Sequence, residues 1–338
     1  MGAITEYFRH CNRVSAMTTT LRHRVTNVNG ATLHLTEAGE PGAPLILLSH
    51  GFPECAYSWR HQMEPLAAAG YHVIAPDQRG YGHSSAPHDV SFYGINNLAG
   101  DLCALIDEQG HEQAIFVGHD WGAIIVWETA RLFPERVKAV VGVSVGFTQW
   151  PMRPTELFKA AFGDRFFYMS YFQNIGPPEK ELDANPRDSM SKVLWVASKD
   201  GFPGVPDELP PMEGTGFLSL TNTPPPLPWR WLTAADLDYY TAQYTQSGFF
   251  GPVSYYRNLD ANYEFTKDIS PDRISMPSFF ISGADDVVNL MNPTAIDTMA
   301  ATLPDFRGGV LIPDAGHWTQ QEQPEVFNAA LLNFLQTI

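Results

Sequence analysis

The fold class follows from residues 114–126, AIFVGHDWGAIIV. The apolar run at 114–117 predicts a strand buried on both faces, and the stretch that starts at Trp121 predicts a helix. Between them, Gly118 and Gly122 lie two positions before and after Asp120. Glycine is needed at both places only where the chain turns so tightly that larger side chains would collide. The segment therefore predicts a strand, a sharp turn and a helix, with Asp120 projecting from the turn.

Strands and helices alternate on both sides of this segment. A β-hairpin is expected at 21–36, where two alternating stretches flank Asn29-Gly30. Further buried strands are expected at 45–49, 73–75, 137–143, 278–282 and 310–312, and helices at 58–69, 96–109, 121–133, 293–303 and 324–335. This alternation predicts an α/β fold with a mostly parallel central sheet that helices cover on both faces.

The alternation stops between residues 147 and 271. Helical segments are expected there at about 154–174, 185–199 and 234–246, together with a Pro-rich stretch at 203–228. An insertion of this kind is how a lid is added to a sheet, although a Pro-rich stretch can also be a mobile surface loop. We therefore expect four parts: a flexible N-terminal arm (1–20), the first part of the core (21–146), a mainly helical cap with a Pro-rich loop (147–271) and the second part of the core (272–338).

Composition limits the partners. The chain of 338 residues has a formal charge of −16, which argues against nucleic acid and anionic membrane surfaces, since both are negative. Cys11, Cys55 and Cys103 lack metal-ligand spacing and indicate reduced thiols in a cytoplasmic protein. The first residues lack the apolar region of a signal peptide, and no apolar run reaches the roughly 18 residues of a membrane helix. We expect a cytoplasmic monomer or homodimer.

The chemistry of Asp120 follows from its place in the turn. Small-x-Asp-x-small after a strand and before a helix is the pattern of a nucleophile elbow, with Asp where better-known hydrolases carry Ser. The positive end of the helix favours an ionised carboxylate there. A carboxylate that attacks a saturated carbon forms an alkyl ester, so the substrate must offer a strained C–O or a C–halogen bond. The alternative is that Asp120 only caps the helix.

A base and an orienting acid follow the last two expected strands. His317 lies in a Gly-His-Trp turn after the strand at 310–312, where the third member of a nucleophile–acid–histidine triad belongs. It would deprotonate a water that attacks the ester on Asp120. Two acids follow the strand at 278–282, and the Gly-x-x-Asp spacing selects Asp286 over Asp285. Asp286 would orient the imidazole and stabilise its charged form.

An oxyanion hole is expected from the loop after the strand at 45–49. This loop reads His50-Gly51-Phe52-Pro53, and its backbone faces the turn that carries Asp120. The backbone N–H groups of Phe52 and Trp121 would stabilise the tetrahedral intermediate. The Phe52-Pro53 bond is a candidate for the cis form.

These motifs resemble those of soluble epoxide hydrolases. The resemblance is carried by HGFPECAYSWRHQ (50–62), DQRGYGHSS (77–85), GHDWGA (118–123) and GHWTQ (316–320), and it runs from about Leu21 to the C-terminus. It implies an α/β-hydrolase core, a helical cap, an Asp-His-Asp triad and no cofactor. The implied substrates are water and a small, uncharged, apolar epoxide.

The resemblance also implies two cap tyrosines that protonate the epoxide oxygen. The segment GPVSYYRN (251–258) matches the second tyrosine motif and selects Tyr256. The segment YFQ (171–173) resembles the first motif and selects Tyr171, but the following Asn-Ile-Gly departs from the family pattern, so Tyr168 is the alternative. Side chains expected to contact the substrate are Phe52, Trp121, Tyr171, Tyr256 and Trp318.

Two other functions share parts of this pattern. A haloalkane dehalogenase has the same fold, nucleophile and histidine, and Trp121 could bind the departing halide. However, the loop position that can supply a second halide donor is Phe52, and the cap offers tyrosines instead. A non-catalytic ligand-binding protein on a hydrolase scaffold is the third interpretation, since a fold does not fix a function.

Overall fold

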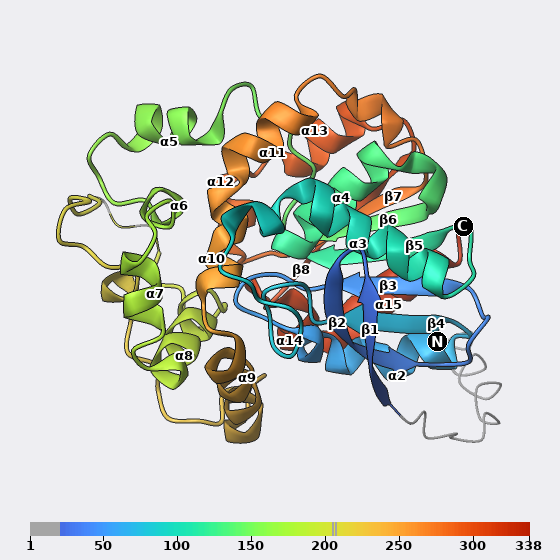
Figure 1. Ribbon diagram of the computed structural model, residues 1–338, viewed down its shortest axis with the longest axis horizontal. Coiled ribbons are helices and arrows are strands. Elements are labelled where there is room, and N and C mark those ends of the chain that lie inside the picture. Colours follow the sequence, from blue (N-terminus) through green and yellow to red (C-terminus); the bar gives the residue numbers. More distant parts are fainter. Residues whose placement is uncertain (1–20, 205, 207) are drawn as a thin grey trace, which may run out of the picture.

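One sheet of eight strands organises the described part of the chain. The computed structural model describes residues 21–338 except 205 and 207, so the arm expected at 1–20 lies outside the described residues. The strand order is β1-β2-β4-β3-β5-β6-β7-β8 (Figure 1). The strands are β1 (Arg22–Val28), β2 (Ala31–Ala38), β3 (Leu45–Ser49), β4 (His72–Pro76), β5 (Ala114–His119), β6 (Val137–Val143), β7 (Ser278–Gly283) and β8 (Phe306–Ile312). The β1–β2 and β2–β4 pairs are antiparallel and the others are parallel, which confirms the predicted α/β class.

The expected hairpin joins β1 and β2. Asn29 and Gly30 have φ angles of 46° and 73°, and a two-residue turn of type I′ requires positive φ at both positions. Further along, the apolar runs in β3, β4 and β5 are buried at every position. A strand needs such a continuous run only when helices cover both faces of its sheet.

Helices cover both faces of the sheet, as alternate residues of β3 show. Leu45 and Leu47 belong to the core that contains residues of α3 and α4, whereas Ile46 and Leu48 belong to the core that contains residues of α2 and α15. In Figure 1, α4 lies at the level of β6 and β7, and α2 lies below β4. The helices of this part are α2 (Arg60–Ala68), α3 (Ile95–Glu108), α4 (Trp121–Leu132), α12 (Val287–Met291), α13 (Ala295–Thr302), α14 (Thr319–Glu322) and α15 (Pro324–Leu335), with 3-10 turns η1 (Ala56–Trp59), η2 (Val90–Tyr93), η3 (Pro134–Arg136) and η5 (Pro271–Arg273).

A mainly helical cap separates β6 from β7. It contains α5 (Pro154–Phe162), α6 (Tyr168–Tyr171), α7 (Pro177–Leu182), α8 (Pro186–Val196), the 3-10 turn η4 (Leu218–Leu220), α9 (Ala234–Ser247), α10 (Phe250–Arg257) and α11 (Leu259–Thr266). Helices α5 to α9 form the left side of Figure 1, away from the helices that cover the sheet. The sequence did not predict α7, α10 and α11, which are short. Gly251-Pro252 near the start of α10 also reads as a helix-breaking signal. Among the described residues, no helix has the length and apolar character needed to span a bilayer.

The described part of the Pro-rich stretch is attached to the rest of the cap. Arg165 and Pro211 form an antiparallel bridge. Phe166 N donates to Pro210 O at 2.7 Å, and Met212 N donates to Asp164 O at 2.7 Å. These bonds hold the segment around residues 210–212 against the chain just before α6.

Candidate active site

The turn between β5 and α4 places Asp120 in a strained backbone conformation. Its φ of 51° and ψ of −118° are rare for a residue with a side chain. The flanking glycines make the turn possible: a Cβ on Gly118 would lie 2.1 Å from Gly122 O, and a Cβ on Gly122 would lie 2.0 Å from Ser49 O. The chain therefore presents the Asp120 carboxylate at the carboxyl edge of the sheet.

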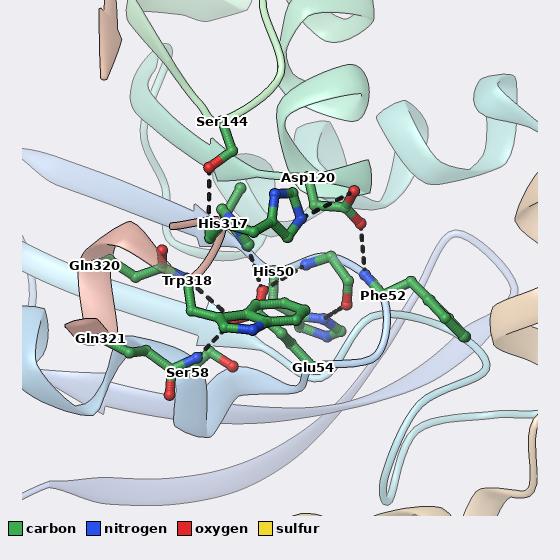
Figure 2. A network of polar contacts seen from close by, with 12 residues as sticks. His50, Phe52, Glu54, Ser58, Asp120, Ser144, His317, Trp318, Gln320 and Gln321 are labelled. Carbon is green, nitrogen blue, oxygen red and sulfur yellow. Dashed lines mark hydrogen bonds and ion pairs between the residues drawn. The ribbon is translucent and has the colours of Figure 1, made fainter. Parts of the chain in front are cut away.

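Two groups hold the Asp120 carboxylate from different sides. Phe52 N donates to Oδ1 at 2.7 Å, and His317 Nε2 lies 3.6 Å from Oδ2 (Figure 2). Phe52 belongs to the loop after β3, and its bond to Pro53 is cis. Trp121 is the first residue of α4, so its N–H is one of the helix's free N-terminal donors beside Asp120.

Asp286 orients the imidazole from the other side. Its Oδ1 lies 3.1 Å from His317 Nδ1, and the carboxylate also accepts bonds from Ser282 Oγ and Val288 N. Asp286 is fully buried, whereas Asp285 is exposed. Burial alone would raise the pKa of Asp286, but the charge and hydrogen bond of His317 and the hydrogen bond from Val288 N hold that pKa below its ordinary value. The structure thus brings Asp120, His317 and Asp286 together.

His317 lies between two carboxylates. Its burial disfavours the charged imidazolium, but Asp286 and Asp120 together raise the pKa of His317 well above its ordinary value. The backbone of His317 is fixed as well, because its N–H donates to Ala197 O at 3.0 Å and its carbonyl accepts bonds from His119 Nε2 and Ser144 Oγ (Figure 2). The ring is therefore held in one orientation between the two acids.

Trp318 and Glu322 join the histidine loop to the cap. The indole N–H of Trp318 donates to Leu194 O, near the end of α8, at 2.7 Å. Glu322 accepts bonds from the N–H groups of Gly316 and Trp318, on either side of the histidine, and from Lys199 N in the cap. Trp318 was expected to contact the substrate. The structure packs it against His317 with only 1% of its surface exposed.

Tyr256 of α10 lies over the Asp120 turn. Its ring centroid is 5.0 Å from that of Trp121, 5.6 Å from Phe52 and 5.8 Å from Tyr168. Burial first, and then the charge of Asp120, raise the pKa of both Tyr256 and Tyr168. Both hydroxyl groups therefore keep their protons and lie within the electrostatic reach of the Asp120 carboxylate.

Tyr171 does not join this pair. Its hydroxyl donates to Glu181 Oε2 at 2.9 Å, and its pKa is raised by burial and by Glu181 and Glu179, with no contribution from Asp120. The expectation that Tyr171 partners Tyr256 is thus not met. The tyrosine beside Tyr256 is Tyr168, the alternative that the sequence left open. The two side chains leave the single turn of α6 about 60° apart, so Tyr168 can face Tyr256 while the Tyr171 hydroxyl bonds to Glu181.

Comparison with known proteins identifies the family. A family model described as the α/β hydrolase fold matches residues 44–196. Epoxide hydrolase A of Mycobacterium tuberculosis (strain ATCC 25618 / H37Rv) is 44% identical over 92% of this chain and 96% of its own length. The crystal structure of epoxide hydrolase A from Mycobacterium thermoresistibile is 45% identical with a TM-score of 0.86, and the match covers 94% of this chain and 98% of that one. The crystal structure of an epoxide hydrolase from Vigna radiata is 36% identical with a TM-score of 0.85, covering 96% and 100%. The chain belongs to the epoxide hydrolase family.

Sequence reasoning missed a buried ion pair beneath the site of this epoxide hydrolase family member. His119 Nδ1 lies 2.5 Å from Glu54 Oε2, and both side chains are fully buried. Gln320 and Gln321 donate to the other oxygen of Glu54. Although burial alone would raise it, the neighbouring His119 lowers the pKa of Glu54 to about 2. A glutamate directly after the His-Gly-Phe-Pro motif was the available signal, because a charged residue among buried neighbours requires a partner.

Two further residues of this family member connect the helices that carry the tyrosine pair. The Gln173 amide donates to Met169 O beside Tyr168 at 2.8 Å and to Tyr256 O at 2.9 Å. Arg257 Nε donates to Phe172 O at 3.0 Å. Both residues belong to the tyrosine motifs of the sequence. Through these bonds, their amide and guanidinium groups link the backbone near Tyr168 to α10, which carries Tyr256. No group of three or more His, Cys, Asp and Glu side chains among the described residues could hold a metal ion.

Proposed function

We propose that this protein hydrolyses an uncharged, apolar epoxide to a vicinal diol through a covalent ester on Asp120. The observation that supports the proposal is the set of groups around the Asp120 carboxylate. A backbone donor holds Oδ1, an oriented imidazole lies beside Oδ2, and two protonated tyrosines lie over the same turn. A nucleophile, a base and a pair of acids are the groups that this two-step reaction requires.

The first step is ring opening. A carboxylate oxygen of Asp120 attacks one carbon of the epoxide, and the C–O bond of that carbon breaks with its electron pair on oxygen. We assign Tyr168 and Tyr256 as the hydrogen-bond donors to this oxygen, one of which transfers its proton. The raised pKa of each tyrosine keeps the proton in place beforehand, and an alkoxide is basic enough to take it.

The second step is hydrolysis of the ester. His317 removes a proton from water as the water oxygen attacks the ester carbonyl of Asp120. Asp286 stabilises the imidazolium that forms. The N–H of Phe52, which already contacts Oδ1, and that of Trp121 would stabilise the oxyanion. Collapse of the intermediate breaks the ester bond to the substrate oxygen, which takes the proton from His317, and the remaining proton of the water returns to the tyrosinate left by the first step. This restores the Asp120 carboxylate and releases the diol.

The test uses three substrates and one matched variant. The purified protein is incubated with styrene oxide, an aliphatic terminal epoxide and a chloroalkane, and diol and halide are quantified. Diol from an epoxide that disappears in Asp120→Asn is expected. Halide without diol would show that the protein is a dehalogenase. If none of the three substrates gave a product, the proposal that the protein hydrolyses apolar epoxides would be refuted.

The covalent step has its own test in His317→Gln. This variant should form the ester but fail to hydrolyse it, so mass spectrometry of the protein with excess epoxide should show one added substrate mass on the peptide that contains Asp120. A competent wild-type enzyme whose variant carries no adduct would contradict the ester mechanism. We also propose a cytoplasmic location, which the free thiols of Cys55 and Cys103 support.

A further inference from the structure

Glu181 of α7 fastens the Pro-rich stretch to the helix that carries Tyr168. Its Oε2 accepts bonds from Tyr171 Oη at 2.9 Å and from Phe217 N at 3.0 Å, and its Oε1 accepts one from Leu218 N at 2.9 Å. The approach is so close that a Cβ on Gly216 would lie 2.4 Å from Oε1. Hydrogen bonds to a carboxylate are among the stronger ones in proteins. One side chain therefore fixes two neighbouring backbone groups of an otherwise irregular segment.

This attachment places one aromatic ring against the tyrosine site. The ring centroid of Phe217 lies 5.0 Å from that of Phe172 and 5.9 Å from that of Tyr168. Phe172 in turn lies 5.1 Å from Tyr256 and 5.7 Å from Phe52. Through Phe217, the Pro-rich stretch therefore packs against the aromatic rings that surround Tyr168 and Tyr256.

We propose that Glu181 sets the size limit for the substrate by fixing Phe217 as a wall beside the tyrosine pair, an inference that rests on the proposed function. Phe217, held against Phe172 and Tyr168, occupies space beside one of the two tyrosines assigned to the epoxide oxygen. A substrate that carries bulk on both epoxide carbons needs this wall to move, whereas a terminal epoxide does not. Glu181 is a specificity-determining residue that acts through Phe217, and Tyr171 is its partner.

The test compares two aryl epoxides of different width. Styrene oxide carries one phenyl group, and trans-stilbene oxide carries one on each epoxide carbon. The ratio of kcat/KM for the wider to the narrower epoxide is measured in the wild type, Glu181→Gln, Phe217→Leu and Phe217→Ala. Glu213→Gln is the matched control, because Glu213 is an exposed glutamate of the Pro-rich stretch that also carries Phe217. Thermal unfolding of each variant verifies that it is folded.

We expect the kcat/KM ratio of the wider to the narrower epoxide to rise in the Phe217 and Glu181 variants. It should rise about tenfold in Phe217→Ala, equivalent to about 1.4 kcal/mol of transition-state free energy, and less in Phe217→Leu. Glu181→Gln should raise it in the same direction and speed amide hydrogen exchange at Phe217 and Leu218, while Glu213→Gln leaves it within about twofold of the wild type. An unchanged ratio in Glu181→Gln, or a fall in Phe217→Ala, would overturn the proposal.

A second measurement separates this inference from the proposed function. Binding of both epoxides is measured in Asp120→Asn, which cannot form the ester, with and without Glu181→Gln. A gain in affinity for the wider epoxide alone supports the inference even if the wild type releases no diol, and that failure would count against the proposed function only. Equal affinities in the two variants would count against the role of Glu181 whether or not diol forms.

Discussion

Ester formation on Asp120 should change the protonation of the base that later hydrolyses the ester. In the free protein, His317 lies between two carboxylates, and both raise its pKa. In the proposed mechanism, attack on the substrate would convert the Asp120 carboxylate into a neutral ester, which would remove one of these two charges. The imidazolium then loses a stabilising partner, so the pKa of His317 must fall. Asp120→Asn reproduces this change because an amide, like an ester, is neutral and similar in size.

The size of the fall follows from one distance. His317 Nε2 and Asp120 Oδ2 are 3.6 Å apart, and at an effective dielectric constant of about 20 two unit charges at this separation attract by about 4 to 5 kcal/mol. Since one pKa unit corresponds to about 1.4 kcal/mol, the pKa of His317 should fall by roughly three units. Asp286, whose Oδ1 is 3.1 Å from Nδ1, stays in place and keeps the ring oriented.

The assay is an NMR titration of the His317 ring in the wild type and in Asp120→Asn. Asp285→Asn is the control, because it removes an exposed carboxylate from the same loop that carries Asp286, and solvent screens its effect. We expect the imidazolium to persist to a pH well above 6.5 in the wild type and to lose its proton at a pH roughly three units lower in Asp120→Asn.

A His317 pKa that stays within about one unit of the wild-type value in Asp120→Asn would refute this reasoning. It would mean that Asp286 alone sets the protonation of the ring and that the nucleophile and the base are electrostatically independent. The expected outcome has a mechanistic consequence: the ring becomes a competent base when the ester exists and stays protonated when it does not.

Three further outcomes follow from the structure. Tyr168→Phe and Tyr256→Phe should each slow ring opening by roughly a hundredfold in single-turnover kinetics, and the double variant should nearly abolish it. The pKa of Glu54 lies near 2 when folded against an ordinary 4.5, so its stabilising effect is present above pH 4.5 and is lost as the pH falls towards 2; urea unfolding should show a loss of about 3 kcal/mol that is absent in Glu54→Gln. Gly122→Ala, whose Cβ would lie 2.0 Å from Ser49 O, should lower the free energy of unfolding by about 3 kcal/mol or more in denaturant titrations.

The parts of the fold that the sequence predicted are those with a strong local signal. The strands β3 and β6 have the predicted bounds: β3 is an apolar run that ends at Ser49, and β6 is a buried run interrupted only by the exposed Lys138. Helix α10 carries Gly251-Pro252 near its start, and it forms because its face packs on the core: Gly251 Cα approaches Gly80, and Tyr255 Oη donates to Arg79 O at 2.8 Å. Such tertiary contacts override local preference and cannot be read from a short window of sequence.

The site could be predicted where chain order fixes it and not where side chains from distant elements meet. The turn after β5, the acid after β7 and the histidine after β8 each follow a recognisable strand, and parallel strands bring their carboxyl ends to one edge. The pair Glu54–His119 joins two such loops through side chains only. Its two members stand 65 residues apart, and neither position alone reveals the partner.

The choice between Tyr168 and Tyr171 shows which kind of information the sequence lacked. The two tyrosines begin and end the single turn of α6, so their side chains leave the helix about 60° apart. Either could have faced Asp120, since the motif fixes the helix but not its rotation about its own axis. In the structure the Tyr171 hydroxyl donates to Glu181, on the side of the Pro-rich stretch, and the ring centroid of Tyr168 lies 5.8 Å from that of Tyr256. We expect the bond between Tyr171 and Glu181 to help fix this rotation, and the same carboxylate attaches α6 to the segment that carries Phe217.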